Sequence, residues 1–261
     1  MAIVEQKIGI VGGTGRMGRW FAQLLIKTGY EVLLSGQDTS LTAVELAKQC
    51  DVVVISVPIG KTIDVIKEIA PLLPKNGVMM DLTSIKSGPI SAMLEFSSSE
   101  VVGIHPLFGP GDIGCEDLNI ALCPGRGNRA LEWIKDLFIK EGYRVFCIDA
   151  KDHDKIMGLI QGVNHLSTIA LAVCVQRSGF NIKDVIKLST RTFIERLDRI
   201  RAVIEQPTEL FESLLMNNPY SGDTVETYME SVRELIKVVK NNDHEEFHAL
   251  FRDLAVMLKD S

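Results

Sequence analysis

A glycine-rich turn near the amino terminus carries the first chemical signal of the chain. Gly13, Gly15 and Gly18 fit the pattern G-x-G-x-x-G directly after the β-branched run Ile8–Val11 and before a stretch with helical apolar spacing. In a strand–turn–helix unit, Gly13 is expected to permit the tight turn, Gly15 the approach of a diphosphate and Gly18 close packing of the helix. The helix N-terminus then offers free N–H groups and a partial positive charge to the phosphates. A glycine turn that only joins strand to helix is the alternative.

The ribose end of this predicted nucleotide site has no acidic residue at the expected place. The second strand ends in Leu34-Ser35-Gly36-Gln37, whereas NAD enzymes usually carry a carboxylate there. Because no carboxylate repels a 2′-phosphate, and because Ser35 and Arg16 can contact one, the sequence is compatible with NAD or NADP. The residues of the turn that we expect to contact the cofactor are Gly13, Thr14, Gly15, Arg16, Met17 and Gly18, with Ser35 at the ribose.

A second group of polar residues follows two further predicted strands. The segments Asp81–Pro89 and Gly103–Pro110 stand at strand ends, and the carboxyl ends of parallel strands line the ligand crevice of an open α/β sheet. His105 in the second segment is suited to accept a proton near neutral pH while a hydride leaves. A histidine that only fixes its own loop, rich in Pro and Gly, is the alternative.

The elements that position these residues alternate over the first 150 residues. Short β-branched runs separated by amphipathic stretches, such as 17–28 and 62–72, indicate a nucleotide-binding, Rossmann-like α/β domain with a mainly parallel sheet. The run Val52–Val57 begins with four apolar residues and is typical of a central strand buried on both faces. The other predicted strands are Ile8–Val11, Val32–Leu34, Val78–Met80, Val101–Ile104, Ile120–Leu122 and Tyr143–Ile148.

After residue 150 the strand-like runs disappear and periodic apolar positions indicate helices only. We therefore predict a dinucleotide-binding domain over 1–150 and an all-helical domain for substrate binding and dimerisation over 151–261. One long helix is expected from Asp152 to about Arg177, where Ser178-Gly179 ends it. Further helices are predicted at Ile182–Glu205, Thr208–Met216, Asp223–Lys240 and His244–Lys259.

Composition narrows the class of partner. The chain of 261 residues is 46% hydrophobic and 24% charged, as in ordinary soluble proteins, and its net charge of -6 argues against nucleic acid or an anionic membrane as partner. A small-molecule substrate is the better expectation. Five scattered cysteines predict reduced, mostly buried thiols and a cytoplasmic location. Residues 1–7 lack the features of an export signal, and no run approaches the roughly 18 apolar residues of a membrane span.

Taken together, these motifs resemble the prephenate dehydrogenase family, which oxidatively decarboxylates prephenate or arogenate on the route to tyrosine. The resemblance lies in the turn from Val11 to Gly18, in Ser56-Val57-Pro58-Ile59, in the S-x-K core of Asp81–Pro89, in H-P-x-F-G-P at His105–Pro110, and in His153-Asp154 followed by Met157 and Gln161. It implies NAD(P)-dependent conversion of prephenate to 4-hydroxyphenylpyruvate by a homodimer joined through its helical domain. It also adds Ser56, Val57 and Pro58 to the cofactor site.

The resemblance further implies roles for single residues. His105 matches the catalytic histidine that accepts the proton of the substrate 4-hydroxyl, and Ser84 the catalytic serine that holds this histidine. Arg201, six residues before Pro207, is the best match for the arginine that binds the substrate carboxylate, with Arg196 and Arg199 as competitors. The other expected substrate-binding residues are Lys86, Gln161 and His165, the last with a polar helix stripe as its alternative.

Other functions remain open at this point. The charged stretch before Arg201 departs from the family, so arogenate or an amino-substituted prephenate is an alternative substrate. A non-catalytic regulatory protein of the same fold is an alternative function. A β-hydroxyacid dehydrogenase would instead use Lys151 or Lys155. We expect a stand-alone catalytic unit without chorismate mutase or regulatory segments.

One motif indicates a different enzyme class. The residues His244-Glu245-Glu246-Phe247-His248 match the zinc-protease pattern H-E-x-x-H, in which two histidines one helical turn apart bind the metal. A catalytic zinc needs a third protein ligand, and downstream only Asp253 and Asp260 offer carboxylates. Asp243 and Glu246 have capping-box spacing, which favours an ordinary solvated helix start. We therefore expect no metal site.

Overall fold

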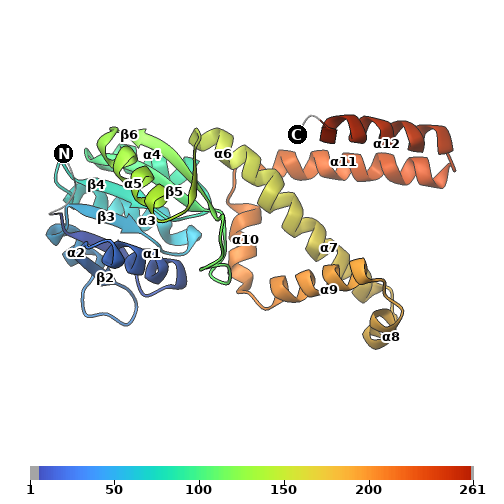
Figure 1. Cartoon of the computed structure of the whole chain (residues 1–261), viewed down its shortest axis with the longest axis horizontal. Helices are drawn as coiled ribbons and strands as arrows, with labels where there is room; N and C mark the ends of the chain where they lie inside the picture. The colour runs from blue at the N-terminus through green and yellow to red at the C-terminus, as the bar shows by residue number, and fades with distance from the viewer. Residues whose placement is uncertain (1–5, 260–261) are drawn as a thin grey trace.

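Seven strands form a single sheet with the order β2-β1-β3-β4-β5-β6-β7 in the computed structural model, which describes residues 6–259 (Figure 1). Every neighbouring pair is parallel except β5 and β6, which are antiparallel. The mainly parallel sheet and all seven predicted strands are thus confirmed. Their bounds are β1 Ile8–Val11, β2 Val32–Ser35, β3 Val52–Ile55, β4 Val78–Asp81, β5 Glu100–Pro106, β6 Asn119–Arg126 and β7 Arg144–Cys147.

Helices cover both faces of the sheet because the strand side chains alternate between two cores. Val52 and Val54 of β3 belong to one buried cluster, which is closed by α1 and α5, whereas Val53 and Ile55 belong to the other, under α2, α3 and α4. The predicted helices 17–28 and 62–72 correspond to α1 and to α3 with the short 3-10 turn η1. The bounds are α1 Arg16–Lys27, α2 Ala43–Gln49, α3 Ile59–Ile69, η1 Ala70–Leu72, α4 Ser87–Phe96 and α5 Arg129–Lys140.

The remainder of the chain is helical and extends away from the sheet (Figure 1). The expected long helix is a continuous stretch of α6, the π-helical turn η2 and α7, and the residue 150 boundary falls at its start. The prediction of one helix over Ile182–Glu205 is wrong, because α8 ends at Lys187 and a separate helix, α9, begins at Arg191. Thr190 caps α9 by accepting a hydrogen bond from the N–H of Phe193. The bounds are α6 Ala150–Met157, η2 Gly158–Val163, α7 Asn164–Arg177, α8 Ile182–Lys187, α9 Arg191–Ile204, α10 Thr208–Met216, α11 Ser221–Lys240 and α12 His244–Lys259.

Two compositional expectations need correction. Of the five free cysteines, Cys50 and Cys123 are buried, but Cys115, Cys147 and Cys174 are exposed, so the thiols are not mostly buried. The stretch Ala150–Arg177 is also long and apolar enough to cross a membrane by length and composition, which the sequence analysis did not anticipate. Apolar core helices of water-soluble proteins have the same profile, so this is weak support for a span. The expectations for residues 1–5 and for Asp260 lie outside the described residues.

Gly12, rather than Gly13, makes the tight turn of the glycine-rich loop. Its φ of +80° lies in the left-handed region, where a side chain is strained, and a Cβ there would also collide with the Ser56 carbonyl. Gly13 is needed for space, because a Cβ would stand 2.6 Å from Leu34 Cδ2 and 2.9 Å from the Ile10 carbonyl oxygen. Gly18 has the predicted packing role.

We predict that Gly18→Ala destabilises the loop and weakens nucleotide binding. Its new Cβ would lie 2.5 Å from the Gly12 carbonyl oxygen and 2.8 Å from Gly13 Cα, both backbone atoms with little room to move. Overpacking of this kind costs about 1–3 kcal/mol of unfolding free energy, measurable by urea denaturation. Gly222→Ala is the matched control, since its added Cβ meets no atom within 4 Å beyond its chain neighbours and the adjacent backbone of its own helix. Equal stability of the two variants would contradict the close packing.

Candidate active site

His105 is buried at the end of β5, with only 2% of its surface exposed. Its Nδ1 lies 2.9 Å from Nε2 of His153, which α6 presents from the helical half of the chain. The two rings meet edge to face, with centroids 5.0 Å apart. His105 is therefore fixed by an element beyond the sheet, and not only by its own loop.

The carboxylate of Asp154 holds this arrangement from behind. Its Oδ1 accepts hydrogen bonds from His153 Nδ1 and from the Lys86 amide, each at 2.8 Å, and its Oδ2 accepts one from the Ser87 amide, also at 2.8 Å. The backbone carbonyl of Asp154 accepts a hydrogen bond of 2.7 Å from the side chain of buried Asn218. Asp154 thus joins α6 to the start of α4 and to the turn before α11.

Gln161 reaches the other nitrogen of His105 from the π-helical turn η2. Its Nε2 lies 3.4 Å from His105 Nε2, which is a long contact. A π-helical turn inserts extra backbone into a helix and is frequent at functional sites. Gln161 therefore lies next to His105, and its expected role in substrate binding stays a prediction. Nothing in the apolar spacing indicated the π-helical turn.

Burial lowers the pKa of His105 well below its usual value, and the neighbouring His153 ring and the Lys86 ammonium lower it further. The ring is therefore neutral at neutral pH and has a lone pair to accept a proton. Such a group is a competent general base only while it stays unprotonated, which this environment ensures.

Lys86 has no exposed surface. Its ammonium pairs with the carboxylate of Asp81 at the end of β4 and donates a hydrogen bond of 2.9 Å to the carbonyl of Ile104, the residue before His105. Thr83 also donates to Asp81 from the same loop. Lys86 was expected among substrate-binding residues; here its side chain lies behind His105, and its contact with substrate stays a prediction.

Ser84 lies half-buried in the loop between β4 and α4, two residues before Lys86. It was expected to hold the catalytic histidine. His105 Nδ1 instead shares a hydrogen bond with Nε2 of His153, a residue that the motifs singled out without a role. The part of Ser84 in the site therefore stays a prediction. The motifs included His153 and Asp154 without giving them a role, and Asn218 is the supporting residue that sequence reasoning missed.

The glycine-rich loop fits a nucleotide diphosphate. Gly15 precedes α1 with no side chain capping the helix and no acidic residue in its first turn, so the first amides of α1 stay free for an anion. The carbonyl of Ser35 accepts hydrogen bonds from Gly12 and Gly13, which places the end of β2 beside the loop. Ser56 is tied to Val11 by a 2.7 Å backbone hydrogen bond, and Pro58 precedes α3. The expected cofactor residues therefore lie together at one sheet edge.

Arg16 links this loop to the helical half. Its guanidinium donates a hydrogen bond of 3.1 Å to Gln206 Oε1, in the segment between α9 and α10. The C-terminal end of α9 therefore lies close to the glycine-rich loop. Arg201 in the last turn of α9 is exposed and pairs with Asp198 at 2.8 Å.

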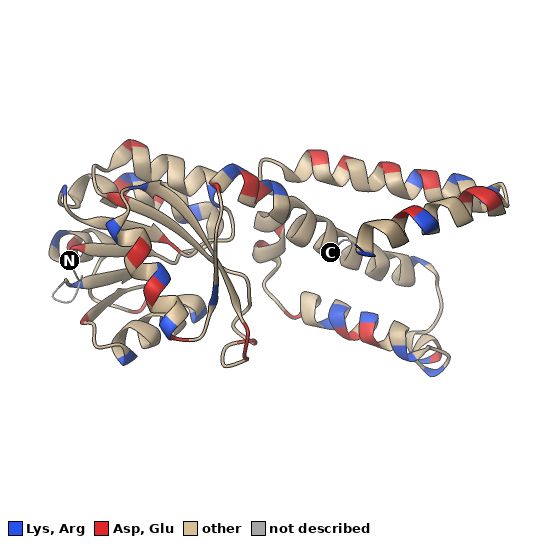
Figure 2. Cartoon of the chain, turned by 45° about the horizontal axis from the view of Figure 1, so that its top comes forward, with Lys and Arg blue, Asp and Glu red and all other residues tan. Residues whose placement is uncertain are grey.

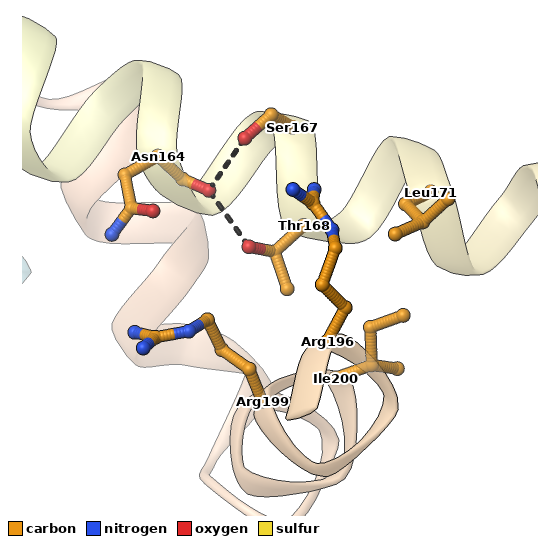
Figure 3. Close-up of a pocket in the computed structure, with 7 residues that line it drawn as sticks. All are labelled: Asn164, Ser167, Thr168, Leu171, Arg196, Arg199 and Ile200. Carbon is orange, nitrogen blue, oxygen red and sulfur yellow. Dashed lines mark hydrogen bonds between the residues drawn. The ribbon is translucent and has the colours of Figure 1, made fainter. Parts of the chain in front are cut away.

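A polar cavity of about 140 Å³ lies between α7 and α9 (Figure 3). Arg196 and Arg199 contribute to it from α9, and their guanidinium groups point in different directions, Arg199 toward the Asn164 end. Ser167 and Thr168 donate to the Asn164 carbonyl at 3.0 and 2.9 Å. Arg201 is not among the lining residues, which are Asn164, Ser167, Thr168, Leu171, Arg196, Arg199 and Ile200.

His165 packs against the helix α10. Its ring meets Phe211 edge to face, with centroids 5.0 Å apart, and burial lowers its pKa. This ring contact accounts for a histidine on the face of α7 that packs against α10. A role of His165 in substrate binding stays a prediction.

The H-E-x-x-H residues lie on α12, where His244 and His248 are both exposed. Within residues 6–259, no group of three or more His, Cys, Asp or Glu side chains is arranged to hold a metal ion. Asp243 caps the helix by accepting from the Glu246 amide at 3.0 Å, as its spacing predicted.

Comparison with protein families agrees with this geometry. Residues 29–147 match the nucleotide-binding domain of prephenate dehydrogenase, and residues 149–253 match the prephenate dehydrogenase dimerization domain. The chain belongs to the prephenate dehydrogenase family. The match to the first domain begins after the glycine-rich loop, whose assignment rests on the loop geometry.

Individual relatives carry corresponding names. The chain is 32% identical to a probable arogenate/prephenate dehydrogenase of Methanocaldococcus jannaschii, over 95% of this chain and 60% of that protein. It is 30% identical to the T-protein of Haemophilus influenzae, over 92% and 64%. The chain therefore spans less than two thirds of these relatives. The crystal structure of Aquifex aeolicus prephenate dehydrogenase with hydroxyphenyl propionate and NAD+ superposes with a TM-score of 0.78, covering 98% of both chains at 18% identity, which shows a shared fold.

Proposed function

We propose that this protein catalyses the NAD- or NADP-dependent oxidative decarboxylation of prephenate to 4-hydroxyphenylpyruvate in the cytoplasm, as a step of tyrosine biosynthesis. The observation that supports this most directly is a buried neutral histidine, His105, at the carboxyl end of β5, on the same sheet edge as the glycine-rich loop, in a chain of this family. Arogenate, which one relative's name includes, is the alternative substrate with the same reacting ring.

The chain's residues supply a base and a fixed geometry. His105 Nε2 accepts the proton of the substrate 4-hydroxyl as hydride leaves C4 and the ring carboxylate leaves C1 as CO2. The proton returns to the same oxygen, which is the phenol of the aromatic product. Aromatisation favours the reaction, so the protein's contribution is to position the groups and to hold the base unprotonated.

A nicotinamide cofactor supplies the hydride acceptor when bound. The free amides of α1 would hold its diphosphate, with Thr14 and Arg16 in the loop and Ser35 at the ribose. The carboxylate nearest to the end of β2, that of Asp38, is exposed and lies three residues beyond Ser35. The ribose end of the site therefore has no carboxylate that would favour the 2′-hydroxyl of NAD over the 2′-phosphate of NADP. Both NAD and NADP fit this edge.

Arg201 is our choice for the substrate carboxylate. It stands only five residues before Gln206, which contacts Arg16 of the nucleotide loop, and a helix rises about 1.5 Å per residue. Of the three candidate arginines it is thus nearest to the nucleotide along the chain. Its exposed pair with Asp198 is worth at most about 1 kcal/mol and can be exchanged for a carboxylate of the substrate.

We also propose a homodimer formed through the helical half, as the description of the matched dimerization domain suggests. The helices α11 and α12 run side by side and project from the rest of the chain (Figure 1), and large apolar side chains on both are exposed. Figure 2 shows acidic and basic residues interspersed along both halves of the chain. Exposed apolar residues include Leu235, Ile236 and Val239 of α11 and Phe251, Leu254 and Met257 of α12.

Replacing the base tests the proposed function. His105→Asn should lower kcat by at least about 100-fold, the low end for loss of a general base, because an amide cannot accept the hydroxyl proton. Cofactor affinity, measured by fluorescence titration, should stay close to that of the unmodified protein. His244→Asn, on the exposed face of α12, is the histidine control. Near-normal turnover of His105→Asn would remove His105 from this role.

Three arginine variants test the carboxylate site. Arg201→Met should raise KM for prephenate about 10- to 100-fold, since a charge-assisted hydrogen bond contributes about 1.5–3 kcal/mol. Arg196→Met is the matched control, ten residues before Gln206, and should change KM by less than about threefold on the same scale. If Arg199→Met has the largest effect instead, the substrate carboxylate occupies the cavity between α7 and α9.

A further inference from the structure

We propose that His153 and Asp154 are a positioning pair that selects the ring tautomer of His105 and directs its Nε2 lone pair at the substrate. This deepens the proposed function and rests on it for its catalytic meaning. The geometric basis is a hydrogen-bonded chain that runs from Asp154 Oδ1 to His153 Nδ1 and from His153 Nε2 to His105 Nδ1, at 2.8 and 2.9 Å.

The proton positions follow from the acceptor at the end of the chain. Asp154 is buried, which raises its pKa, but hydrogen bonds from His153, Ser87 and Lys86 outweigh burial and lower the pKa overall. It is therefore a carboxylate and can only accept hydrogen bonds. His153 must then carry its proton on Nδ1, which leaves Nε2 as an acceptor. His105 must in turn carry its proton on Nδ1, and its Nε2 is left bare.

The bare nitrogen is the one that faces Gln161. Gln161 Nε2 lies 3.4 Å from it, too long for a strong hydrogen bond, so a substrate hydroxyl that donates to this nitrogen displaces little. In the opposite tautomer, Nε2 would carry the proton, and His105 could not act as the base. A wrong tautomer is costly: in the serine-protease triad, loss of the orienting carboxylate reduces kcat by about 10⁴-fold.

The buried groups behind His105 carry opposite formal charges. The groups that face His105 are His153 from α6 and Lys86 from the loop before α4, with Asp81 and Asp154 behind them. With Lys86 and both carboxylates charged, this buried group carries a net charge of −1. When the 4-hydroxyl O–H bond breaks and the N–H bond at Nε2 forms, the incoming proton neutralises it. The proton then returns to the phenol oxygen.

Substitution of His153 tests the pair without removing its structural anchor. Asp154 also joins α6 to α4 through the amides of Lys86 and Ser87, so its variants risk unfolding. His153→Asn can keep a side-chain N–H toward Asp154 but is too short to accept from His105. His153→Gln is the longer variant, which can reach His105 with a carbonyl oxygen. His244→Asn is again the exposed control.

The decisive measurement is the tautomer of His105, read from ¹⁵N chemical shifts of histidine-labelled protein near neutral pH, with His105→Asn used to assign the signal. We expect a protonated Nδ1 and a bare Nε2 in the unmodified protein, and a mixture with protonated Nε2 in His153→Asn. In parallel, kcat of His153→Asn should fall about 10- to 100-fold, the range for partners behind a reacting group, with cofactor affinity unchanged and partial rescue in His153→Gln.

The two readouts separate the proposals. A protonated Nε2 in the unmodified protein, or an unchanged tautomer in a folded His153→Asn variant, would overturn the positioning pair whatever the activity. A bare Nε2 that is lost in His153→Asn would support the pair even if prephenate is not turned over, in which case the proposed function fails alone. A merely structural role of His153 predicts lower stability with an unchanged His105 tautomer.

Discussion

The hydrogen bonds to the Asp154 carboxylate are the constraint on which the site depends. One buried carboxylate accepts from the amides of Lys86 and Ser87 and from the ring of His153. Charged acceptors make hydrogen bonds roughly twice as strong as neutral ones, and a buried carboxylate without such donors would be expensive. The sheet and the first helix of the helical half are thereby fixed together at the point where His105 needs a partner.

A second buried charge lies on the sheet side of the same histidine. The ammonium of Lys86 pairs with Asp81 and donates to the carbonyl of Ile104, which ties the ends of β4 and β5 together. A buried ion pair of this kind contributes little net stability, because desolvation offsets the attraction, but loss of one partner leaves an uncompensated charge. Its value here is geometric, because it fixes the strand ends. The pKa of His105 is lowered mainly by burial, with smaller contributions from His153 and Lys86.

Sequence reasoning could predict what depends on local patterns. The β-branched runs predicted all seven strands. Val52–Ile55 is the clearest case, because a strand buried on both faces must be apolar. The turn residue Gly12 was missed, because the motif marks which glycines occur and not which has the positive φ. The separation of α8 from α9 depends on a single N-cap residue, Thr190. The contacts of His153, Asn218 and Gln161 join segments 48 to 64 residues apart or depend on a π-helical turn, and periodicity carries no signal for either.

The most direct test of the account is the absorbance of reduced nicotinamide when the purified protein is mixed with prephenate and either NAD+ or NADP+. The account predicts that the signal grows with at least one cofactor and that 4-hydroxyphenylpyruvate and CO2 form in equal amounts. The same assay with arogenate decides between the two substrates. No signal with either substrate, in protein shown by titration to bind the cofactor, would contradict a catalytic His105 site and leave a nucleotide-binding protein without turnover.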